Sequence, residues 1–386
     1  MKTNQIAESL ESKFSNLANK FNKKKKIKYS LGLGEPSFNT PKQIIKAANI
    51  AMVKGFTRYS SPFGIEKLRL AIVKKYSKKI KKKLNIKNVI ITPGSKMALS
   101  LSLMSILKDN DEIIYFSPCY TSYLPQILIT NIKVKPIKIL LRKSDFKIDI
   151  ERLQKKLNKK TKAIIFNFPN NPTGQILDKE SYFQIRKLLL KFKKCIIICD
   201  EIYDDLFFEK KKKYSFFFDP KLTNRAILIN GFSKNFSMTG WRIGYCIADQ
   251  NIIKKMSLYQ QHISTNVPVF TQLAALESFK IKKNFLTIYK KNLLENFRYL
   301  CKIFEKSKKF KVKASYGGLF CFVDISGYRM NSDDFCSIIL KKLSIAITPG
   351  IFFGSEWKKY VRISLAIENK YFIKAVQKLK TFLNKI

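Results

Sequence analysis

Lys234 and Arg242 follow one apolar segment of the chain closely enough to act on the same ligand. Lys234 ends the run Gly231-Phe232-Ser233-Lys234, which comes shortly after the apolar residues 226–229. A lysine amine at the carboxyl end of a strand can bond to an aldehyde as a Schiff base, and an arginine beside it can hold a phosphate. Because lysine is abundant in this chain, a solvated loop lysine is the alternative.

Asp200 ends a second apolar segment, residues 195–199, and Tyr203 follows in the same run. Burying a charged carboxylate at such a position is costly unless a partner compensates the charge. A protonated heteroaromatic nitrogen would be such a partner. The alternative is that Asp200 caps the amino terminus of a following helix.

A third segment, Thr92-Pro93-Gly94-Ser95-Lys96, follows an apolar run and opens a predicted helix. The first N–H groups of a helix, together with its dipole, could hold a phosphate. Ordinary turn formation at Gly94 is the alternative. Glycines are scarce, at 14 in the chain, and those at or near the ends of the predicted strands are Gly94, Gly174, Gly231, Gly240 and Gly244. In an open parallel sheet the ligand crevice lies at the carboxyl ends of the strands, so these segments are expected to meet there.

The elements that would position these residues alternate in type between residues 88 and 250. Short apolar runs are separated by longer amphipathic runs, which is typical of strands joined by helical crossovers in a largely parallel sheet. The predicted strands are 88–91, 112–116, 163–168, 195–199, 226–229 and 243–247. Several are apolar on both faces, as expected when helices cover both sides of a sheet. The pattern predicts an α/β fold.

A second, smaller α+β unit is predicted after this sheet, since 386 residues exceed what one core usually holds. A long helical stretch from 251 to about 304, interrupted near Val267-Pro268, leads out of the sheet. Beyond it, strands are predicted at 319–325, 345–348 and 361–365 and helices at 331–342 and 369–384. We therefore predict three segments: 1–45 packing with the small domain, 46–285 as the large domain, and 286–386 as the small domain.

The formal net charge of +48 would by itself suggest a nucleic acid or an anionic membrane as partner. The lysines are spread along the whole chain, however, in runs such as 23–26, 78–83 and 210–213. A single basic patch is not formed, so we expect no nucleic-acid partner. A basic nucleic-acid-binding protein is kept as the competing class, and it predicts salt-dependent retention on DNA.

The cysteines and the amino terminus indicate the compartment. The seven cysteines are odd in number, form no CxxC pair and lie mostly in apolar runs, which favours reduced, buried thiols. The first residues lack the apolar region of a secretion signal, and no apolar run approaches the ~20 residues of a membrane span. We expect a cytoplasmic protein that does not enter a membrane.

A single histidine, His262, limits the possible chemistry. Most metal sites, Ser-His-Asp triads and Cys-His pairs need imidazole, so we expect no metal and a structural role for His262. The acid-base group of an enzyme would then be lysine, carboxylate or tyrosine.

Together these segments resemble the class I, fold type I aminotransferases, which depend on pyridoxal 5'-phosphate, and most closely the bacterial aspartate aminotransferases. The resemblance runs almost end to end. Its landmarks are Gly34 to Phe38, Arg58-Tyr59 through Arg69, Pro118 to Tyr123, Asn170 to Gly174, Asp200 to Tyr203, Ser233-Lys234 through Tyr245, and Val361 to Ser364. It implies a large domain with a mostly parallel seven-stranded sheet covered by helices, and a smaller α+β domain built from both chain ends.

The resemblance also implies catalytic roles for Lys234, Asp200 and Tyr203. Lys234 would form the internal aldimine and shuttle a proton between the substrate α-carbon and the cofactor. Asp200 would keep the pyridine nitrogen protonated. Asn171 and Tyr203 would hydrogen-bond the phenolic oxygen of the cofactor.

The remaining cofactor contacts follow from the same resemblance. The phosphate would be bound by Gly94, Ser95, Ser233 and Arg242. Tyr120 would stack on the ring and Lys96 would lie beside the cofactor. Tyr59 would reach the phosphate of the neighbouring subunit, so a homodimer is expected.

For the substrate, the resemblance implies that Arg362 grips the α-carboxylate with two prongs, a geometry that lysine would not reproduce. Gly34 would lie beside the same carboxylate, and Tyr120 and Asn171 would complete the substrate site. Lys96, helped by Ser9, would meet a second carboxylate, because a desolvated carboxylate needs its own cation.

The expected reaction is a two-step, ping-pong amino transfer between an amino acid, first of all aspartate or glutamate, and a 2-oxo acid. Two departures from the aspartate-specific pattern bear on the substrate. Tyr120 stands where tryptophan is usual, and Cys119 replaces a common tyrosine. An aromatic or prephenate aminotransferase is therefore the alternative, and a pyridoxal-phosphate β-lyase on the same fold comes after it.

Overall fold

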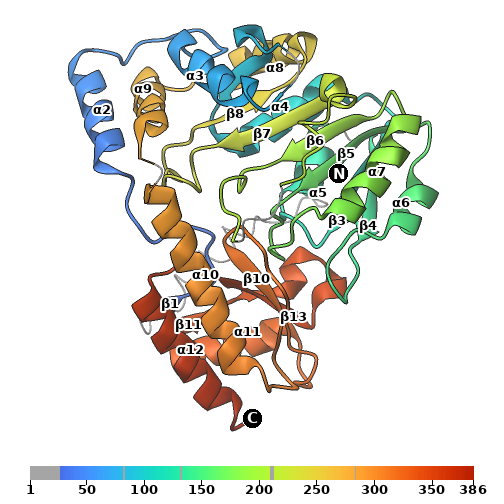
Figure 1. The fold of residues 1–386 in the computed structure, drawn as a ribbon, viewed down its shortest axis with the longest axis vertical. Helices are drawn as coiled ribbons and strands as arrows, with labels where there is room; N and C mark the ends of the chain where they lie inside the picture. Colours follow the sequence, from blue (N-terminus) through green and yellow to red (C-terminus); the bar gives the residue numbers. More distant parts are fainter. Residues whose placement is uncertain (1–26, 81–82, 131–132, 209–212, 283) are drawn as a thin grey trace.

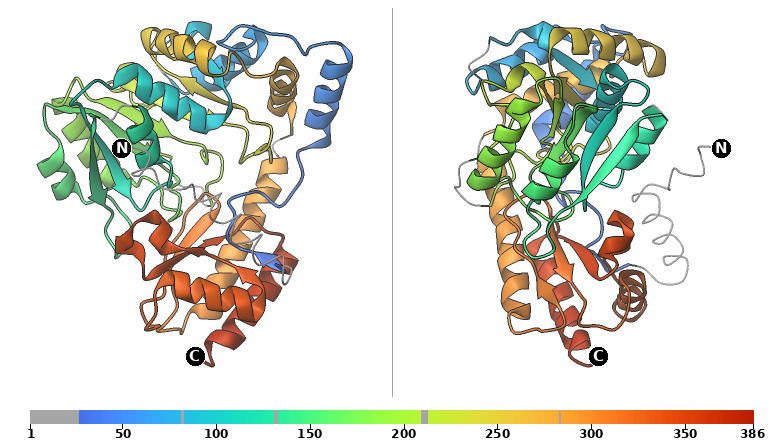
Figure 2. Two further views of the ribbon diagram at one scale, coloured as in Figure 1. Left: turned by 180° about the vertical axis from the view of Figure 1, so that it is seen from behind. Right: turned by 90° about the vertical axis from the view of Figure 1, so that its right-hand side faces the viewer.

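The computed structural model describes residues 27–80, 83–130, 133–208, 213–282 and 284–386. These residues form a larger unit around one sheet and a smaller unit below it (Figure 1). Helix α10 (Asn284–Phe304) runs from the larger unit into the smaller one along one side of the molecule (Figure 2). Within the described parts of the chain, no helix combines the length and the apolar character that a membrane span requires.

The larger unit is built on a seven-stranded sheet with β8 antiparallel to both of its neighbours and every other pair parallel. In spatial order its strands are β2 (Val89–Thr92), β8 (Gly244–Ile247), β7 (Ala226–Gly231), β6 (Ile196–Asp200), β5 (Thr161–Asn167), β3 (Glu112–Ser117) and β4 (Lys135–Leu140). The predicted α/β class and the mostly parallel seven-stranded sheet are confirmed.

The hydropathy pattern located six of these strands and missed β4. Its sequence, Lys-Pro-Ile-Lys-Ile-Leu, contains two lysines and a proline. β4 lies at the edge of the sheet and pairs only with β3 among the described strands. An edge strand tolerates proline and lysine because only one of its sides joins the ladder, so it lacks the continuous apolar run of a central strand.

Both faces of the sheet are buried, which explains the apolar runs. Successive residues point to opposite faces, so Ile197 belongs to one core cluster and Ile198 to the other. Helices of the larger unit pack over these clusters. They are α2 (Lys42–Val53), α3 (Glu66–Ser77), α4 (Gly94–Ile106), α5 (Tyr123–Thr130), α6 (Ile150–Lys156), α7 (Lys179–Lys191), α8 (Gln250–Ile263) and α9 (Val269–Glu277).

The smaller unit combines a four-stranded antiparallel sheet, in the order β12-β13-β10-β9, with helices at its side. Its elements are β9 (Lys311–Val312), β10 (Phe320–Asp324), α11 (Ser332–Leu343), β11 (Ile345–Ala346), β12 (Thr348–Pro349), β13 (Tyr360–Ser364) and α12 (Asn369–Leu383). The early strand β1 (Tyr29–Ser30) pairs in parallel with β11. Both ends of the chain thus contribute to this unit.

Short 3-10 helices complete the structure: η2 (Ile86–Asn88), η3 (Thr223–Arg225), η4 (Ser278–Lys280), η5 (Gly350–Phe353) and η6 (Ser355–Trp357). All seven cysteines are unbonded, six are buried and Cys301 is half-buried, as their apolar context predicted. His262 is exposed on α8.

The long helical stretch differs from the prediction. Pro268 caps α9, which confirms the expected interruption, but a second break follows Glu277, where the chain tightens into η4 before α10 begins at Asn284. The hydroxyl of Ser278 donates to the carbonyl of Ala275 at 2.6 Å, which favours the tighter turn. The expectation of a single interruption was wrong. The predicted domain boundary after residue 285 falls in the first turn of α10 and stays a prediction.

Candidate active site

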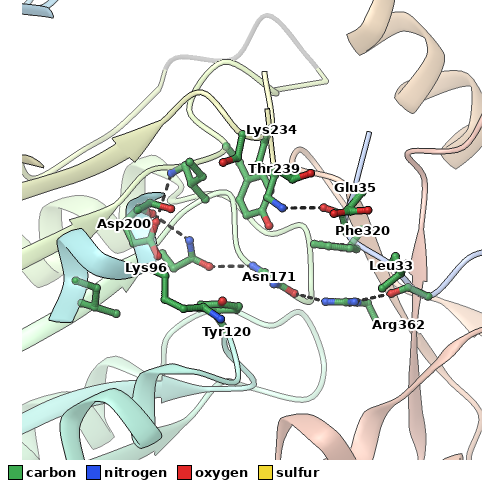
Figure 3. A pocket seen from close by; sticks show the side chains of 18 of the residues that line it. Leu33, Glu35, Lys96, Tyr120, Asn171, Asp200, Lys234, Thr239, Phe320 and Arg362 are labelled. Atoms are coloured by element: carbon green, nitrogen blue, oxygen red, sulfur yellow. Dashed lines mark hydrogen bonds between the residues drawn. The ribbon is translucent and has the colours of Figure 1, made fainter. Parts of the chain in front are cut away.

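A cavity of about 500 Å³ lies at the carboxyl ends of β5, β6 and β7 and is also lined by residues of the smaller unit. Most of the residues singled out from the sequence line it. They are Gly34, Ser95, Lys96, Tyr120, Asn171, Asp200, Tyr203, Ser233, Lys234, Arg242 and Arg362. Figure 3 shows that Lys234 and Asp200 extend from neighbouring strand ends toward the same hollow. Segments far apart in the sequence are brought together here because parallel strands end at one edge of a sheet.

Asp200 is a buried carboxylate at the end of β6, with 8% of its surface exposed. Its Oδ2 accepts a hydrogen bond from the hydroxyl of Tyr123 at 2.6 Å. Burial raises the pKa of Asp200 to about 6, although the Tyr123 hydrogen bond acts in the opposite direction. A turn, not a helix, follows Asp200, so the helix-cap alternative is wrong. The carboxylate is therefore poised to pair with a cationic group in the cavity.

Lys234 lies in the loop after β7 and is only partly exposed. Its Nζ donates a hydrogen bond to the carbonyl oxygen of Gly34 at 2.8 Å (Figure 3). Gly34 belongs to the early segment that joins β1 to α2, so this contact links distant parts of the chain. A partly buried lysine with a defined acceptor is not the solvated loop lysine that was the alternative. Its amine can act as a nucleophile or a base.

A cradle for an anion lies at the start of α4. Gly94 has a φ of +81°, and a Cβ added there would lie 2.6 Å from Nη2 of Arg242. A Cβ on Gly244 would lie 2.5 Å from the amide nitrogen of Ser95. Glycine at both positions lets the arginine and the first amides of the helix approach the same point. Backbone N–H groups at a helix start, together with a guanidinium, suit a phosphate.

The loop after β7 adds polar groups to this cradle. Ser233 and Thr239 line the cavity, and the carbonyl of Thr239 accepts a hydrogen bond from Nη1 of Arg242 at 2.7 Å. Arg242 itself has a φ of +53°, and its guanidinium lies beside Gly94 at the start of α4. Ser233 and Arg242 were predicted from the sequence to bind a phosphate, whereas Thr239 was not.

Arg362 on β13 forms the opposite wall, contributed by the smaller unit, and is 4% exposed. Its Nη1 donates to Oδ1 of Asn171 at 2.9 Å, and its Nη2 donates to the carbonyl of Gly32 at 2.6 Å. The guanidinium carbon lies 4.0 Å from the ring centroid of Phe320. These contacts hold the guanidinium plane, which suits a two-pronged grip on a carboxylate.

Lys96 and Tyr120 lie together on a further part of the lining. The Nζ of Lys96 is 5.6 Å from the ring centroid of Tyr120, and this ring meets that of Tyr123 edge-on at 5.7 Å. Tyr59 is 87% exposed and does not line this cavity. Ser9 lies outside the described residues.

Several lining or supporting residues were not found from the sequence. Asn167 donates through Nδ2 to the carbonyl of Asp200 at 3.0 Å, and its Oδ1 accepts from the amide of Asn171 at 2.9 Å. Its position was a usable signal, because Asn167 ends β5 as its register partner Asp200 ends β6. Tyr123 and Phe320 carried no such signal, since each reaches the site through packing.

Comparisons with known proteins agree with this geometry. The family model described as "Aminotransferase class I and II" matches residues 26–379. The chain belongs to this family. The aminotransferase is 36% identical to the aspartate aminotransferase of Pyrococcus horikoshii, over 91% of this chain and 89% of the relative. It is also 36% identical to the (5-formylfuran-3-yl)methyl phosphate transaminase of Methanocaldococcus jannaschii, over 96% of this chain and 95% of the relative.

The fold also agrees with that of solved aminotransferase structures. The crystal structure of aspartate aminotransferase from Thermotoga maritima matches this aminotransferase with a TM-score of 0.90 at 29% identity, covering 99% of each chain. The predicted family and fold type I are thereby confirmed. The two relatives at 36% identity carry different names for their reactions, so overall identity does not distinguish the substrates of this aminotransferase.

Proposed function

We propose that this aminotransferase uses pyridoxal 5'-phosphate, bound through Lys234, to move an amino group between aspartate or glutamate and a 2-oxo acid in two half-reactions. The observation that carries the proposal is that Lys234 and the buried carboxylate of Asp200 line one cavity. A phosphate cradle opens on that same cavity. When bound, the cofactor acts as an electron sink for the substrate α-carbon.

The polar groups of the cavity fit the parts of this cofactor. Gly94, Ser95, Ser233 and Arg242 would hold the phosphate, and Asp200 would pair with the ring nitrogen. Burial raises the pKa of Asp200 to about 6, which is still below neutral pH, so the carboxylate is largely ionised there and would gain from a cationic partner. Asn171 and Tyr203 would donate hydrogen bonds to the phenolic oxygen, and Tyr120 would lie against the ring.

Lys234 would move the proton. Its Nζ is held by the carbonyl of Gly34 at 2.8 Å and lies on the cavity side of the loop after β7. From this position the amine would take the proton from the substrate α-carbon and deliver it to the aldehyde-derived carbon of the cofactor, which is general acid-base work by a positioned side chain. Lys234 would be the base in place of a histidine, because the single histidine of the chain, His262, is exposed on α8.

Arg362 would orient the substrate. Its guanidinium is already fixed by Asn171 and Gly32 and would bind the α-carboxylate with two parallel hydrogen bonds. Gly34 lines the same cavity and would lie near that carboxylate. A Cβ on Gly34 would lie 2.5 Å from the Phe320 ring, on which Arg362 packs, so there is no room for a side chain at this position. The substrate α-carbon would then lie between Arg362 and Lys234.

Lys96 would select the substrate. It is one of four cationic residues of the lining, with Lys234, Arg242 and Arg362, and a desolvated side-chain carboxylate needs such a partner. Aspartate and glutamate are therefore the proposed donors. The ring of Tyr120, 5.6 Å from the Lys96 ammonium, offers apolar surface as well, which supports an aromatic donor or prephenate as the second candidate.

We also propose a homodimer in which Tyr59 completes the neighbouring site, and a cytoplasmic location in keeping with the free cysteines. Tyr59 is 87% exposed, although tyrosine usually covers its ring. Exposed apolar side chains lie on α2 and just after it: Ile45, Ile50, Met52, Val53 and Phe56. A cluster of this kind is typical of a surface that meets a partner.

A panel of amino donors tests the proposed substrate. Aspartate, glutamate, phenylalanine and tyrosine would each be supplied with 2-oxoglutarate or oxaloacetate, and the amino product would be measured. We expect the acidic donors to react fastest, and Lys96→Met to slow them while sparing the aromatic donors. Lys254→Met, on the exposed face of α8, is the matched control. Faster reaction of the aromatic donors would favour the second candidate, and pyruvate or ammonia release without a 2-oxo acid would favour a lyase.

A further inference from the structure

A network of carboxylates and lysines lies beside the cavity without lining it. The Nζ of Lys213 is 3.4 Å from a carboxylate oxygen of Glu201 and 3.4 Å from one of Asp204. The Nζ of Lys75, on α3, is 3.2 Å from Oδ2 of Asp205. All three acids belong to the loop directly after β6, whose other side chains, Ile202 and Tyr203, face the cavity. The network therefore lies on the side of this loop that faces away from the cavity, while Ile202 and Tyr203 of the same loop line the cavity.

Asp205 connects this loop to the one that carries Lys234. Its Oδ2 accepts a hydrogen bond from Nδ2 of Asn235 at 3.1 Å, in addition to the Lys75 contact. Asn235 follows Lys234 directly in the chain and is 2% exposed. Asp205 thus joins three segments, namely α3, the loop after β6 and the loop after β7.

The strand that precedes the Lys234 loop, β7, is held by hydrogen bonds that do not involve Asp205. At the end of β7, Nδ2 of Asn230 donates to the hydroxyl of Tyr76 at 3.1 Å, and that hydroxyl lies 2.9 Å from the hydroxyl of Tyr245. Beyond the far side of Lys234, the hydroxyl of Thr40 donates to the carbonyl of Ser237 at 2.6 Å. The contact between Asp205 and Asn235 lies between these two hydrogen-bonded positions, and Asn235 is the residue directly after Lys234.

The electrostatics favour a lasting contact between Lys75 and Asp205. Burial alone would lower the pKa of Lys75, but the neighbouring Tyr245, Asp204 and Asp205 raise it above its usual value. Lys75 therefore stays charged, and its ammonium holds the Asp205 carboxylate in the orientation that reaches Asn235.

We propose that Asp205 is a positioning residue for Lys234, a role that rests on the proposed function of Lys234. Asp205 does not touch the cavity and acts through the side chain of Asn235, which fixes the backbone next to the reacting amine. Proton transfer requires the amine to lie within hydrogen-bond reach of the α-carbon, and displacement by about 1 Å can cost up to about 100-fold in rate.

The test compares Asp205→Ala with Asp205→Asn in the holoenzyme. Asp205→Ala removes the acceptor for Asn235, and we expect kcat to fall about tenfold while KM for the amino donor changes little. KM should change little because the donor carboxylate would be bound by Arg362, which lies on the smaller unit and does not depend on the Asp205 contact. The Asn side chain keeps an oxygen that can accept from Asn235, so Asp205→Asn should retain most of the wild-type kcat. A merely structural role would not give this split between kcat and KM or this rescue.

A binding measurement gives a readout that does not depend on turnover. The protein would be stripped of cofactor and titrated with pyridoxal 5'-phosphate, and we expect Asp205→Ala to weaken binding several-fold, with Asp205→Asn close to wild type. The matched control is Asp109→Ala, because Asp109 forms an exposed pair with Lys133 at 2.9 Å near the other end of the sheet. This control should leave kcat, KM and cofactor binding unchanged.

The outcomes separate this inference from the proposed function. Wild-type kcat and cofactor binding in Asp205→Ala would overturn the positioning role alone. A wild-type protein that neither binds the cofactor nor transfers amino groups would instead overturn the proposed function. If Asp205→Ala does not fold, Asn235→Ala removes the same contact, and a lowered kcat there supports the role whereas an unchanged one overturns it.

Discussion

The two walls of the cavity are built in different ways. The wall of the larger unit is made of residues at the ends of adjacent strands, with Asn167 and Asp200 paired in register and Lys234 in the next loop along the sheet. The wall of the smaller unit includes Phe320 and Arg362, and the position of the Arg362 guanidinium depends on contacts with Asn171 and Gly32 from other parts of the chain.

This difference separates the groups suited to binding a cofactor from the group suited to binding a substrate. On the larger unit, strand register and the first turn of α4 place the groups that suit a cofactor, so their spacing follows from secondary structure. On the smaller unit, a side chain reaches across to Asn171, so its position follows from the packing of the two units. We infer that changes to one wall should alter cofactor chemistry and changes to the other should alter substrate binding.

The largest effect is expected from Lys234→Ala. Removing the amine should lower kcat by about 100-fold to 10,000-fold or more, because no other described lining residue replaces a base at that position. The visible absorbance of the bound cofactor should also change, which a spectrum of the purified protein records. Lys254→Ala on α8 is the control. Retained turnover in Lys234→Ala would refute the assignment of this residue.

A smaller and more selective effect is expected from Arg362→Lys. The lysine keeps the charge but loses the planar fork, so KM for the amino donor should rise about tenfold to 100-fold, equivalent to a charged hydrogen bond. The affinity for pyridoxal 5'-phosphate should stay near the wild-type value, because the cradle belongs to the larger unit. Titration of the stripped protein checks this, and an equal loss in both quantities would contradict the separation of the two walls.

The smallest effect is expected from Tyr123→Phe. Burial raises the pKa of Asp200 to about 6 and the Tyr123 hydroxyl opposes that rise, so removing the hydroxyl should raise the pKa further. Asp200 is protonated below its pKa and then cannot pair with a ring nitrogen. Cofactor affinity should therefore decline as pH falls through that value, and the decline should begin at higher pH in Tyr123→Phe.

The measurement is the dissociation constant for pyridoxal 5'-phosphate over a range of pH. Tyr182→Phe is a matched control, since its hydroxyl donates to Asp219 at 2.6 Å outside the cavity. Its pH profile should coincide with that of the wild type. Identical profiles for Tyr123→Phe and wild type would show that the hydroxyl does not tune Asp200.

The larger wall was largely predictable from the sequence. Apolar runs marked the central strands, and the polar residues at their ends, Asp200 and Lys234, could be expected to meet because the carboxyl ends of parallel strands share one edge. The helix start at Gly94 was also visible, because Thr92-Pro93-Gly94 follows an apolar run. The roles assigned to these residues came from the resemblance to a family and remain predictions.

Other features depended on the tertiary structure alone. The hydroxyl of Tyr123 reaches Asp200 from α5, Asp205 reaches Asn235 between two loops, and Phe320 packs on Arg362. The edge strand β4 also escaped the pattern because lysine and proline interrupt it. Hydropathy records which residues of a local segment are buried. It does not record which distant side chain a buried polar group meets, because that choice is made only when separate elements pack together.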